Sequence, residues 1–130
     1  MNPFTDQISA RTKLPSWFRQ EIPDAQKIVQ MKNMFRASNL HTVCESARCP
    51  NMGTCWGRGV ATFMLMGEVC TRACRLCCVF AGRPAALDAE EPRHLAEAIQ
   101  KMNLRYAVLT SVARDDLPDE GAGHFAQTIR

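Results

Sequence analysis

All seven cysteines of this 130-residue chain lie between Cys44 and Cys78. Six of them form two triplets, spaced C-x4-C-x5-C and then C-x3-C-x2-C: Cys44, Cys49 and Cys55 in the first, and Cys70, Cys74 and Cys77 in the second. A zinc site usually takes four ligands from paired C-x2-C knuckles, and a disulfide framework takes an even number of cysteines in a secreted chain, so neither fits well. Three thiolates can instead hold three irons of a 4Fe-4S cluster and leave the fourth iron open to a small molecule. The two triplets therefore predict two metal centres.

Length and composition predict one small intracellular domain. The chain has 46% hydrophobic and 22% charged residues, which is typical of soluble globular domains and argues against disorder. Its net charge of +3 is spread without a basic block, which argues against a nucleic-acid partner. The longest apolar run, residues 60–66, is too short to cross a membrane, and the N-terminus lacks the apolar core of a secretory signal. We therefore expect reduced cysteines, no membrane association and a cytoplasmic location, with an organelle matrix as the alternative.

The segment before the second triplet is predicted to contain an arm, a helix and a loop. Residues 1–21 show no sustained periodicity and predict an extended arm, which Trp17 and Phe18 pin onto a core. A helix is predicted from Pro23 to Ser38, because apolar residues recur there every three or four positions and Asn39 suits its end. The first triplet lies in a glycine-rich segment that favours a loop, whose order is expected to depend on its metal bonds.

A strand, a helix and a second strand are predicted next. Residues 60–66 are continuously apolar, as in a parallel strand covered on both faces, and Gly67 ends this strand. The second triplet follows in the loop at the carboxyl end, where parallel α/β folds bind ligands. A helix from the acidic capping candidates at 88–91 to Asn103 and a buried strand over 106–112 complete a parallel βαβ unit. The last strand ends at the same edge as the second triplet, with Thr110 and Ser111.

The remaining polar and histidine side chains are interpreted as structural or solvated. Residues 113–121 are predicted to form a loop, and residues 123–130 a helix. We interpret the carboxylates of the loop as solvated rather than as an acid–base pair: Asp115, Asp116, Asp119 and Glu120. The histidines match no metal spacing with the cysteines and are interpreted as structural or surface residues: His41, His94 and His124.

Three stretches together resemble the lipoyl synthase family of radical S-adenosylmethionine (SAM) enzymes. They are CESARCPNMGTCW from Cys44, ATFMLMGEVCTRACRLCCV from Ala61 with GRP at residues 82–84, and LRYAVLTSVARDDLPDEGAGHF from Leu104. The resemblance covers the chain from about Leu14 onward. It implies an α/β fold, the start of a partial TIM-like radical SAM barrel, in which residues 1–59 form an N-terminal cysteine-rich extension and residues 60–130 the first βαβ portion. Such barrels need about 200 residues or more, so the barrel is incomplete in this chain.

The resemblance also implies an activity and cofactors. The family is a sulfurtransferase that inserts two sulfur atoms at carbons 6 and 8 of a protein-bound octanoyl group. Cys70, Cys74 and Cys77 would hold a 4Fe-4S cluster whose open iron binds SAM, and one electron delivered through this cluster would cleave SAM to a hydrogen-abstracting 5'-deoxyadenosyl radical. Thr110 and Ser111 match positions that contact the amino acid portion of SAM, although simply ending a strand is an equally weighted role for them.

By the same resemblance, the first triplet would hold an auxiliary 4Fe-4S cluster that is dismantled to supply sulfur. An electron relay and a zinc knuckle are the alternatives. The family's fourth ligand to this cluster is a serine near the C-terminus, so we expect the cluster to be incompletely ligated within these 130 residues. The implied partners are an octanoylated lipoyl carrier domain, an electron donor such as flavodoxin or ferredoxin, and an iron-sulfur cluster delivery protein.

The sequence departs from the family pattern at three points. Where the family usually has C-P-F-C-D, residues 74–78 are C-R-L-C-C, which removes an aromatic residue and adds the seventh thiol. We interpret Cys78 as a non-ligand thiol, because the triplet is complete without it, and keep a competing ligand as the alternative. Ala113 replaces an aspartate that is common in the family before Arg-Asp-Asp.

Three other interpretations remain open. One is a different radical SAM sulfur-inserting enzyme, similar to biotin synthase. The position of the first triplet, upstream of the second, argues against this interpretation. Another is a non-catalytic iron-sulfur or zinc-binding module. The third is an inactive fragment, since two strands cannot enclose a radical and the 130 residues alone are expected not to turn over SAM.

Overall fold

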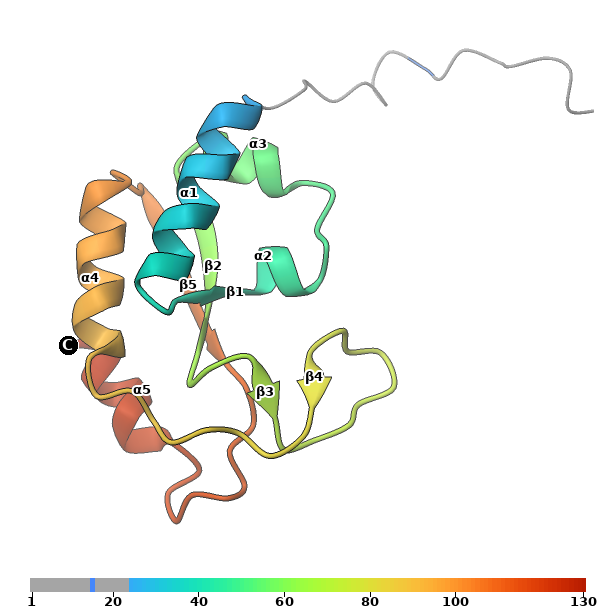
Figure 1. Ribbon diagram of the computed structural model, residues 1–130, viewed down its shortest axis with the longest axis vertical. Coiled ribbons are helices and arrows are strands. Elements are labelled where there is room, and N and C mark those ends of the chain that lie inside the picture. The colour runs from blue at the N-terminus through green and yellow to red at the C-terminus, as the bar shows by residue number, and fades with distance from the viewer. Residues whose placement is uncertain (1–14, 16–23) are drawn as a thin grey trace, which may run out of the picture.

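The computed structural model describes Pro15 and residues 24–130, so the predicted arm with Trp17 and Phe18 lies outside the described residues. Short strands, helices and loops alternate along this part of the chain (Figure 1). The elements are α1 (Ala25–Ala37), β1 (His41–Thr42), α2 (Val43–Ser46), α3 (Met52–Gly57), β2 (Val60–Leu65), β3 (Val69–Cys70), β4 (Phe80–Ala81), α4 (Glu91–Lys101), β5 (Tyr106–Ser111) and α5 (Ala122–Ile129).

The first predicted helix is confirmed as α1. Its N-cap is Asp24, whose carboxylate accepts hydrogen bonds from the amides of Gln26, at 2.9 Å, and Lys27, at 3.4 Å. The helix ends where Asn39 adopts a positive φ of 50° and the amide of Leu40 donates to the carbonyl of Phe35 at 2.8 Å. These contacts satisfy backbone groups that the helix ends leave unpaired, and they carry the chain into β1.

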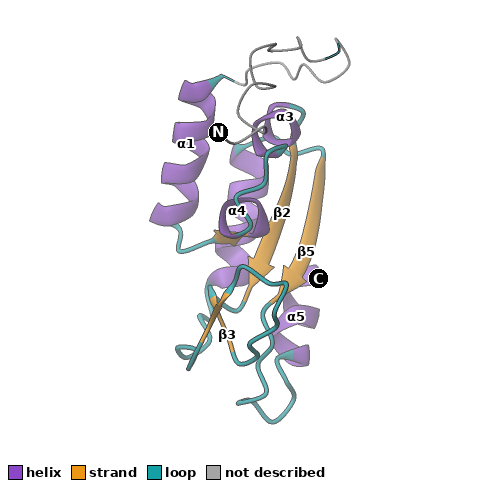
Figure 2. Cartoon of the chain, turned by 90° about the vertical axis from the view of Figure 1, so that its right-hand side faces the viewer, coloured by secondary structure: helices purple, strands orange, loops and turns teal. Residues whose placement is uncertain are grey.

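The parallel βαβ unit is also confirmed. Strands β2 and β5 pair in parallel from Val60 opposite Tyr106 to Leu65 opposite Ser111, with α4 in the connection between them. Figure 2 shows the two strands side by side, with α1 and α4 on one side of them. The sequence analysis missed β1, which pairs antiparallel with the other edge of β2, because two residues are too few for a periodic pattern. The described residues form this three-stranded mixed sheet and a two-stranded sheet of β3 and β4, and no closed barrel.

The prediction that residues 106–112 form a buried strand was wrong for one face. Tyr106 is 65% exposed and Val108 is 38% exposed, whereas Ala107 and Leu109 between them are half-buried. Side chains of a strand alternate between its two faces, so Tyr106 and Val108 share one face of β5, which the described residues leave uncovered. Strand β2, in the middle of the sheet, is buried as predicted, with Phe63, Met64 and Leu65 each at most 2% exposed.

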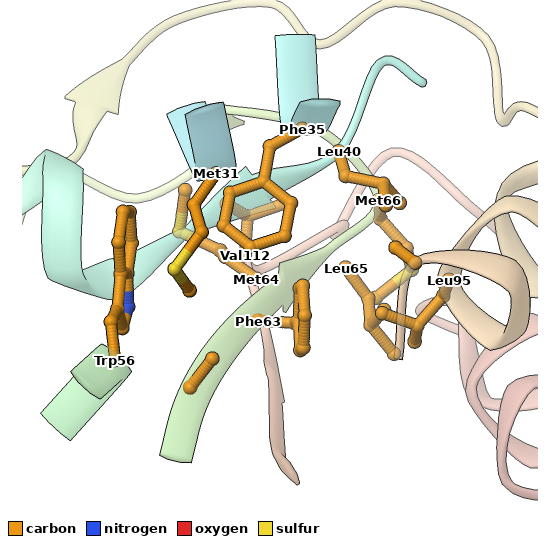
Figure 3. Packing of buried hydrophobic residues seen from close by; sticks show 12 residues of the cluster. Met31, Phe35, Leu40, Trp56, Phe63, Met64, Leu65, Met66, Leu95 and Val112 are labelled. Atoms are coloured by element: carbon orange, nitrogen blue, oxygen red, sulfur yellow. The ribbon is translucent and has the colours of Figure 1, made fainter. Parts of the chain in front are cut away.

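One hydrophobic core joins the cysteine-rich N-terminal region to the βαβ unit (Figure 3). Phe35 of α1 is fully buried and lies edge-to-face against Trp56 of α3 and Phe63 of β2, with ring centroids 5.4 Å apart in both pairs. Aromatic pairs prefer this geometry because the positive edge of one ring meets the negative face of the other. The core therefore holds α3, which carries Cys55, against the strand that leads to the second triplet. None of the described helices has the length and apolar character needed to cross a membrane.

We expect Gly121→Ala to destabilise this fold by about 1–3 kcal/mol. Gly121 precedes α5 with φ at 87°, and an added Cβ would lie 2.2 Å from Sδ of the buried Met66. Urea unfolding of the metal-free chain would measure the loss. Gly57→Ala is the matched control, because a Cβ there meets nothing within 4 Å and its φ is not positive. Equal stability of the two variants would contradict this account of Gly121.

Candidate metal centre

The second triplet lies at the carboxyl end of β2, at the edge expected for a ligand site. Met66 and Gly67 both take positive φ angles, 68° and 95°, and turn the chain out of the strand. Cys70 does not lie in the loop as predicted, because Val69 and Cys70 form β3, which pairs in parallel with β4. Cys74 and Cys77 lie in the connection between these short strands, where the amide of Cys77 donates to the carbonyl of Cys74 at 3.1 Å. The pairing of β3 with β4 closes the base of the loop.

The three thiols of this triplet differ in how firmly they are held. Cys70 is half-buried, and its Sγ accepts hydrogen bonds from the amides of Ala113, at 3.3 Å, and Arg72, at 3.5 Å. Cys74 and Cys77 are exposed. Amide donors stabilise a thiolate and tune the iron-sulfur clusters that thiolates bind. Cys70 is thus already held by the kind of hydrogen bond that a cluster ligand receives.

The stem of the loop is joined to the segment after β5. Arg72 forms a bidentate ion pair with Asp115, in which Nη2 lies 2.6 Å from Oδ1 and Nε lies 3.0 Å from Oδ2. Thr71 donates its hydroxyl to Asp115, and its backbone amide donates to the carbonyl of Ala113 at 3.1 Å. The hydrogen bonds from Arg72 and then from Thr71 hold the pKa of Asp115 well below its ordinary value. This carboxylate is consequently ionised over the physiological pH range.

Asp115 and Asp116 are exposed to solvent, as interpreted, but each also has an ion-pair partner that the sequence analysis did not find. Asp116 pairs with the buried Arg114, whose Nη2 lies 2.8 Å from Oδ2, and this hydrogen bonding lowers the pKa of Asp116. Asp119 accepts from the amides of Gly121 and Gly123 at the start of α5, which lowers its pKa. A polar loop in the sequence does not reveal such partners, because one of them, Arg72, is 43 positions away.

The first triplet is carried by two short helices rather than by the loop that its glycines predicted. Cys44 lies in α2 and Cys55 in α3, with Cys49 between them, and all three thiols are half-buried. Thr42 caps α2, since its hydroxyl accepts from the amide of Glu45 at 3.2 Å. The amide of Cys49 donates to the carbonyl of Cys44 at 3.0 Å. Local hydrogen bonds and burial of Trp56 thus order this segment, because α3 packs into the core.

The thiols match iron-sulfur ligation in their chemistry, although they do not surround a common point. All seven cysteines are free thiols. Within residues 24–130, no three cysteine, histidine or carboxylate side chains come together closely enough to hold one metal ion. The donor set itself fits clusters, since each triplet offers three free thiols and Cys70 is already hydrogen-bonded at sulfur. The roles of the six cysteines as ligands stay predictions.

Cys78 is exposed and lines a cavity of about 290 Å³. Ser46, at the end of α2, lines the same cavity together with Glu68, Val69 and Phe80. The seventh thiol therefore shares a cavity with the end of α2, the helix that carries Cys44. Its interpretation as a non-ligand thiol stays a prediction.

Thr110 and Ser111 lie where the sequence analysis expected them. They are the last two residues of β5, half-buried, and they pair with Met64 and Leu65 of β2. Two residues later, the amide of Ala113 reaches the sulfur of Cys70. The ends of both strands and the base of the cysteine loop thus share one edge of the sheet. Contact of either side chain with SAM stays a prediction.

A buried pair beneath this edge was missed. The carboxylate of Glu91, 4% exposed, accepts from the amide of Met66 at 3.0 and 3.1 Å and lies 2.6 Å from Nε2 of His124. Glu91 was one of the capping candidates at 88–91, but of these Asp88 accepts the hydrogen bond from the amide of Glu90 at that end. His124 is structural, as interpreted. The adjacent Pro92 signalled a helix start, but no sequence signal joined Glu91 to a histidine 33 positions away.

Comparisons with known proteins show which family the sequence resembles. A family model described as the N-terminal domain of lipoyl synthase of the radical SAM family matches residues 4–49. The lipoyl synthases of Deinococcus radiodurans and Syntrophotalea carbinolica are 52% and 56% identical to the chain over 126 and 125 residues, which is 96% of this chain in each case. The chain belongs to the lipoyl synthase family, as an N-terminal portion. The matches cover 38% and 40% of the two relatives, so the chain spans about two fifths of their length.

Proposed function

We propose that the protein is a lipoyl synthase that inserts two sulfur atoms at carbons 6 and 8 of a protein-bound octanoyl group. The observation that carries the proposal is the pair of thiol triplets in a chain similar to lipoyl synthases over 96% of its length. A thiol of the second triplet, Cys70, is also anchored beside the carboxyl ends of two parallel strands. Ligand sites of parallel α/β folds lie at this edge, because the loops that follow the strands converge there.

The fold proposed for the whole protein is a partial radical SAM barrel. Strands β2 and β5 would be its first two parallel strands, with α4 as the crossover and residues 1–59 as the cysteine-rich extension. Among the described residues β5 pairs only with β2, so its other edge is free, which is consistent with a sheet that continues in a longer protein. The division of the chain after residue 59 stays a proposal, because the ring of Phe35 in α1 packs directly against Phe63 of β2 across that boundary.

At the second centre, this chain would supply the ligands and the first walls of a SAM site. Cys70, Cys74 and Cys77 would hold a 4Fe-4S cluster, and Thr110 and Ser111 would contact the amino acid portion of SAM. When bound, this cofactor pair supplies reductive cleavage of SAM and a radical that abstracts hydrogen from unactivated carbon. The residues at the strand ends would orient SAM, while the protein excludes water from the radical.

At the first centre, Cys44, Cys49 and Cys55 would hold an auxiliary 4Fe-4S cluster that donates the sulfur atoms. The partial burial of all three thiols supports a protected centre. The proposed partners are an octanoylated lipoyl carrier domain, an electron donor such as flavodoxin or ferredoxin, and an iron-sulfur cluster delivery protein. The proposed location is the cytoplasm, because thiols stay reduced there.

Metal analysis and turnover of the complete gene product test the function. After anaerobic reconstitution we expect about eight irons and about eight acid-labile sulfides per chain, since two 4Fe-4S clusters contain that number. With SAM and a reductant, we expect 5'-deoxyadenosine and sulfur insertion into an octanoylated carrier domain. One tightly bound zinc with no iron would instead identify a zinc module. A full iron load without SAM cleavage would identify a non-catalytic iron-sulfur protein, and both outcomes would reject the proposal.

A further inference from the structure

The base of the second cysteine loop is held by contacts of Thr71 and Arg72, two residues that are not predicted metal ligands. Arg72 and Thr71, directly after Cys70, both bind Asp115, and Asp115 returns a hydrogen bond from its amide to the hydroxyl of Thr71 at 3.2 Å. The backbone of Thr71 also donates to the carbonyl of Ala113. Residues 70–72 and 113–115 are therefore joined at several points, although 43 positions separate them in the chain.

The contacts end abruptly beyond Arg72. From Ala73 to Cys78 the side chains are all exposed, and Leu76 is fully so. The hydrogen bond described within this stretch joins Cys77 to the carbonyl of Cys74. The loop thus has one fixed thiol, Cys70, and two thiols on a segment with few contacts of its own. A cluster bound by the triplet would require Cys74 and Cys77 to move toward Cys70, since no three ligands lie together now.

We propose that Asp115 is a positioning residue for the second metal centre and acts through Arg72. This proposal rests on the proposed function, because it concerns the cluster that the triplet would bind. The bidentate pair fixes the orientation of the guanidinium plane, which a single contact would leave free. It keeps residues 70–72 against the strand end, so that the amide of Ala113 stays within reach of Cys70 Sγ. Cys70 is then presented in one orientation, and the exposed part of the loop closes on the cluster from that fixed point.

The structure gives a reason why Asp115 serves position rather than general stability. The side chains of Arg72 and Asp115 are 60% and 40% exposed, and exposed ion pairs contribute little to the stability of a fold. Groups that orient metal ligands from outside the coordination sphere nevertheless change metal affinity by about tenfold to a hundredfold. A variant of Asp115 that loses metal but keeps its fold stability would therefore show that Asp115 positions a ligand rather than stabilising the fold.

The test compares Asp115→Ala with Glu97→Ala in the complete gene product. In both variants Cys44, Cys49 and Cys55 are also replaced by alanine, so that the iron content of the protein measures occupancy of the second centre alone. Glu97 is the matched control, because it forms an exposed ion pair with Arg93 at 2.5 Å on α4. We expect Asp115→Ala to retain iron about tenfold less well against a chelator, with the thermal unfolding of the metal-free protein unchanged. Arg72→Ala should have the same effect, and the double variant should be no worse than either single one.

A metal-free measurement separates failure of this inference from failure of the proposed function. Hydrogen–deuterium exchange of peptides that contain residues 71–72 and 113–115 should be about two- to fivefold faster in Asp115→Ala than in Glu97→Ala. If the parent protein binds no iron at the second triplet, the proposed function is wrong. If the parent binds iron and Asp115→Ala retains it as well as Glu97→Ala, the positioning role is wrong. Strictly additive losses in the double variant would also overturn it, because the two residues would then act separately.

Discussion

Replacing Cys70 with alanine is expected to remove the iron of the second centre and abolish SAM cleavage by the complete gene product. The anaerobically reconstituted variant should contain about half of the parent's iron, because the first triplet keeps its three thiols. The change removes the one thiol of the triplet that accepts two amide hydrogen bonds. Iron and sulfide analysis, electron paramagnetic resonance of the reduced protein and 5'-deoxyadenosine release measure the outcome.

Cys78→Ala is the matched control for this experiment. Cys78 lies in the loop that follows β3 and is exposed, but the three-cysteine spacing is complete without it. We expect this variant to keep its full iron load and its activity. A Cys70→Ala protein that retains both complete clusters and SAM cleavage would refute the assignment of the second triplet. A loss confined to Cys78→Ala would show instead that the seventh thiol is a ligand.

Glu91→Ala is expected to have the largest effect on the stability of the fold. The substitution removes a buried carboxylate and leaves two buried donors, the amide of Met66 and Nε2 of His124, without their acceptor. An unsatisfied buried donor costs about 1–3 kcal/mol, so the free energy of unfolding should fall by about 2–6 kcal/mol. Urea unfolding of the metal-free chain, followed by circular dichroism, measures this difference.

Glu90→Ala provides the comparison on the same helix. Glu90 caps no backbone group with its side chain and forms an exposed ion pair with Arg93. We expect its loss to leave the free energy of unfolding nearly unchanged. Glu91→Gln should fall between the two, since its amide oxygen can still accept one of the two hydrogen bonds. If Glu91→Ala unfolds at the same urea concentration as Glu90→Ala, the buried pair does not stabilise the fold as described.

The position of this pair connects stability to the candidate site. Glu91 begins α4, Met66 follows the last residue of β2, and His124 lies in the first turn of α5. Gly121 allows α5 to start close to Met66, because it has no Cβ to meet the methionine sulfur. The turn that carries the chain from β2 toward Cys70 is therefore held from beneath by two helices. We infer that substitution of Glu91 also disturbs the sheet edge at the carboxyl ends of β2 and β5, beside which Cys70 lies.

Patterns within short stretches allowed much of this structure to be predicted. Helices α1 and α4 follow from apolar residues repeating every three or four positions, and β2 follows from a continuous apolar run. Each of these signals lies inside the element that it predicts. The same patterns failed for β1, β3 and β4, because a two-residue strand contains the two-residue period only once and so shows no repeat. They also failed for the exposed face of β5, since exposure depends on what covers a strand rather than on its own residues.

The spacing of the cysteines alone determined that this protein has two groups of three thiols. Continuous apolar runs and the periodic helix between them determined a parallel βαβ unit with the second group at its edge. Only the tertiary structure decided which thiol is anchored and which acidic residues have partners. Cys70 meets Ala113, Arg72 meets Asp115, and Glu91 meets His124, at separations of 33 to 43 positions. Such pairs arise when strands and helices pack, because burial and the need to satisfy polar groups select among many possible partners.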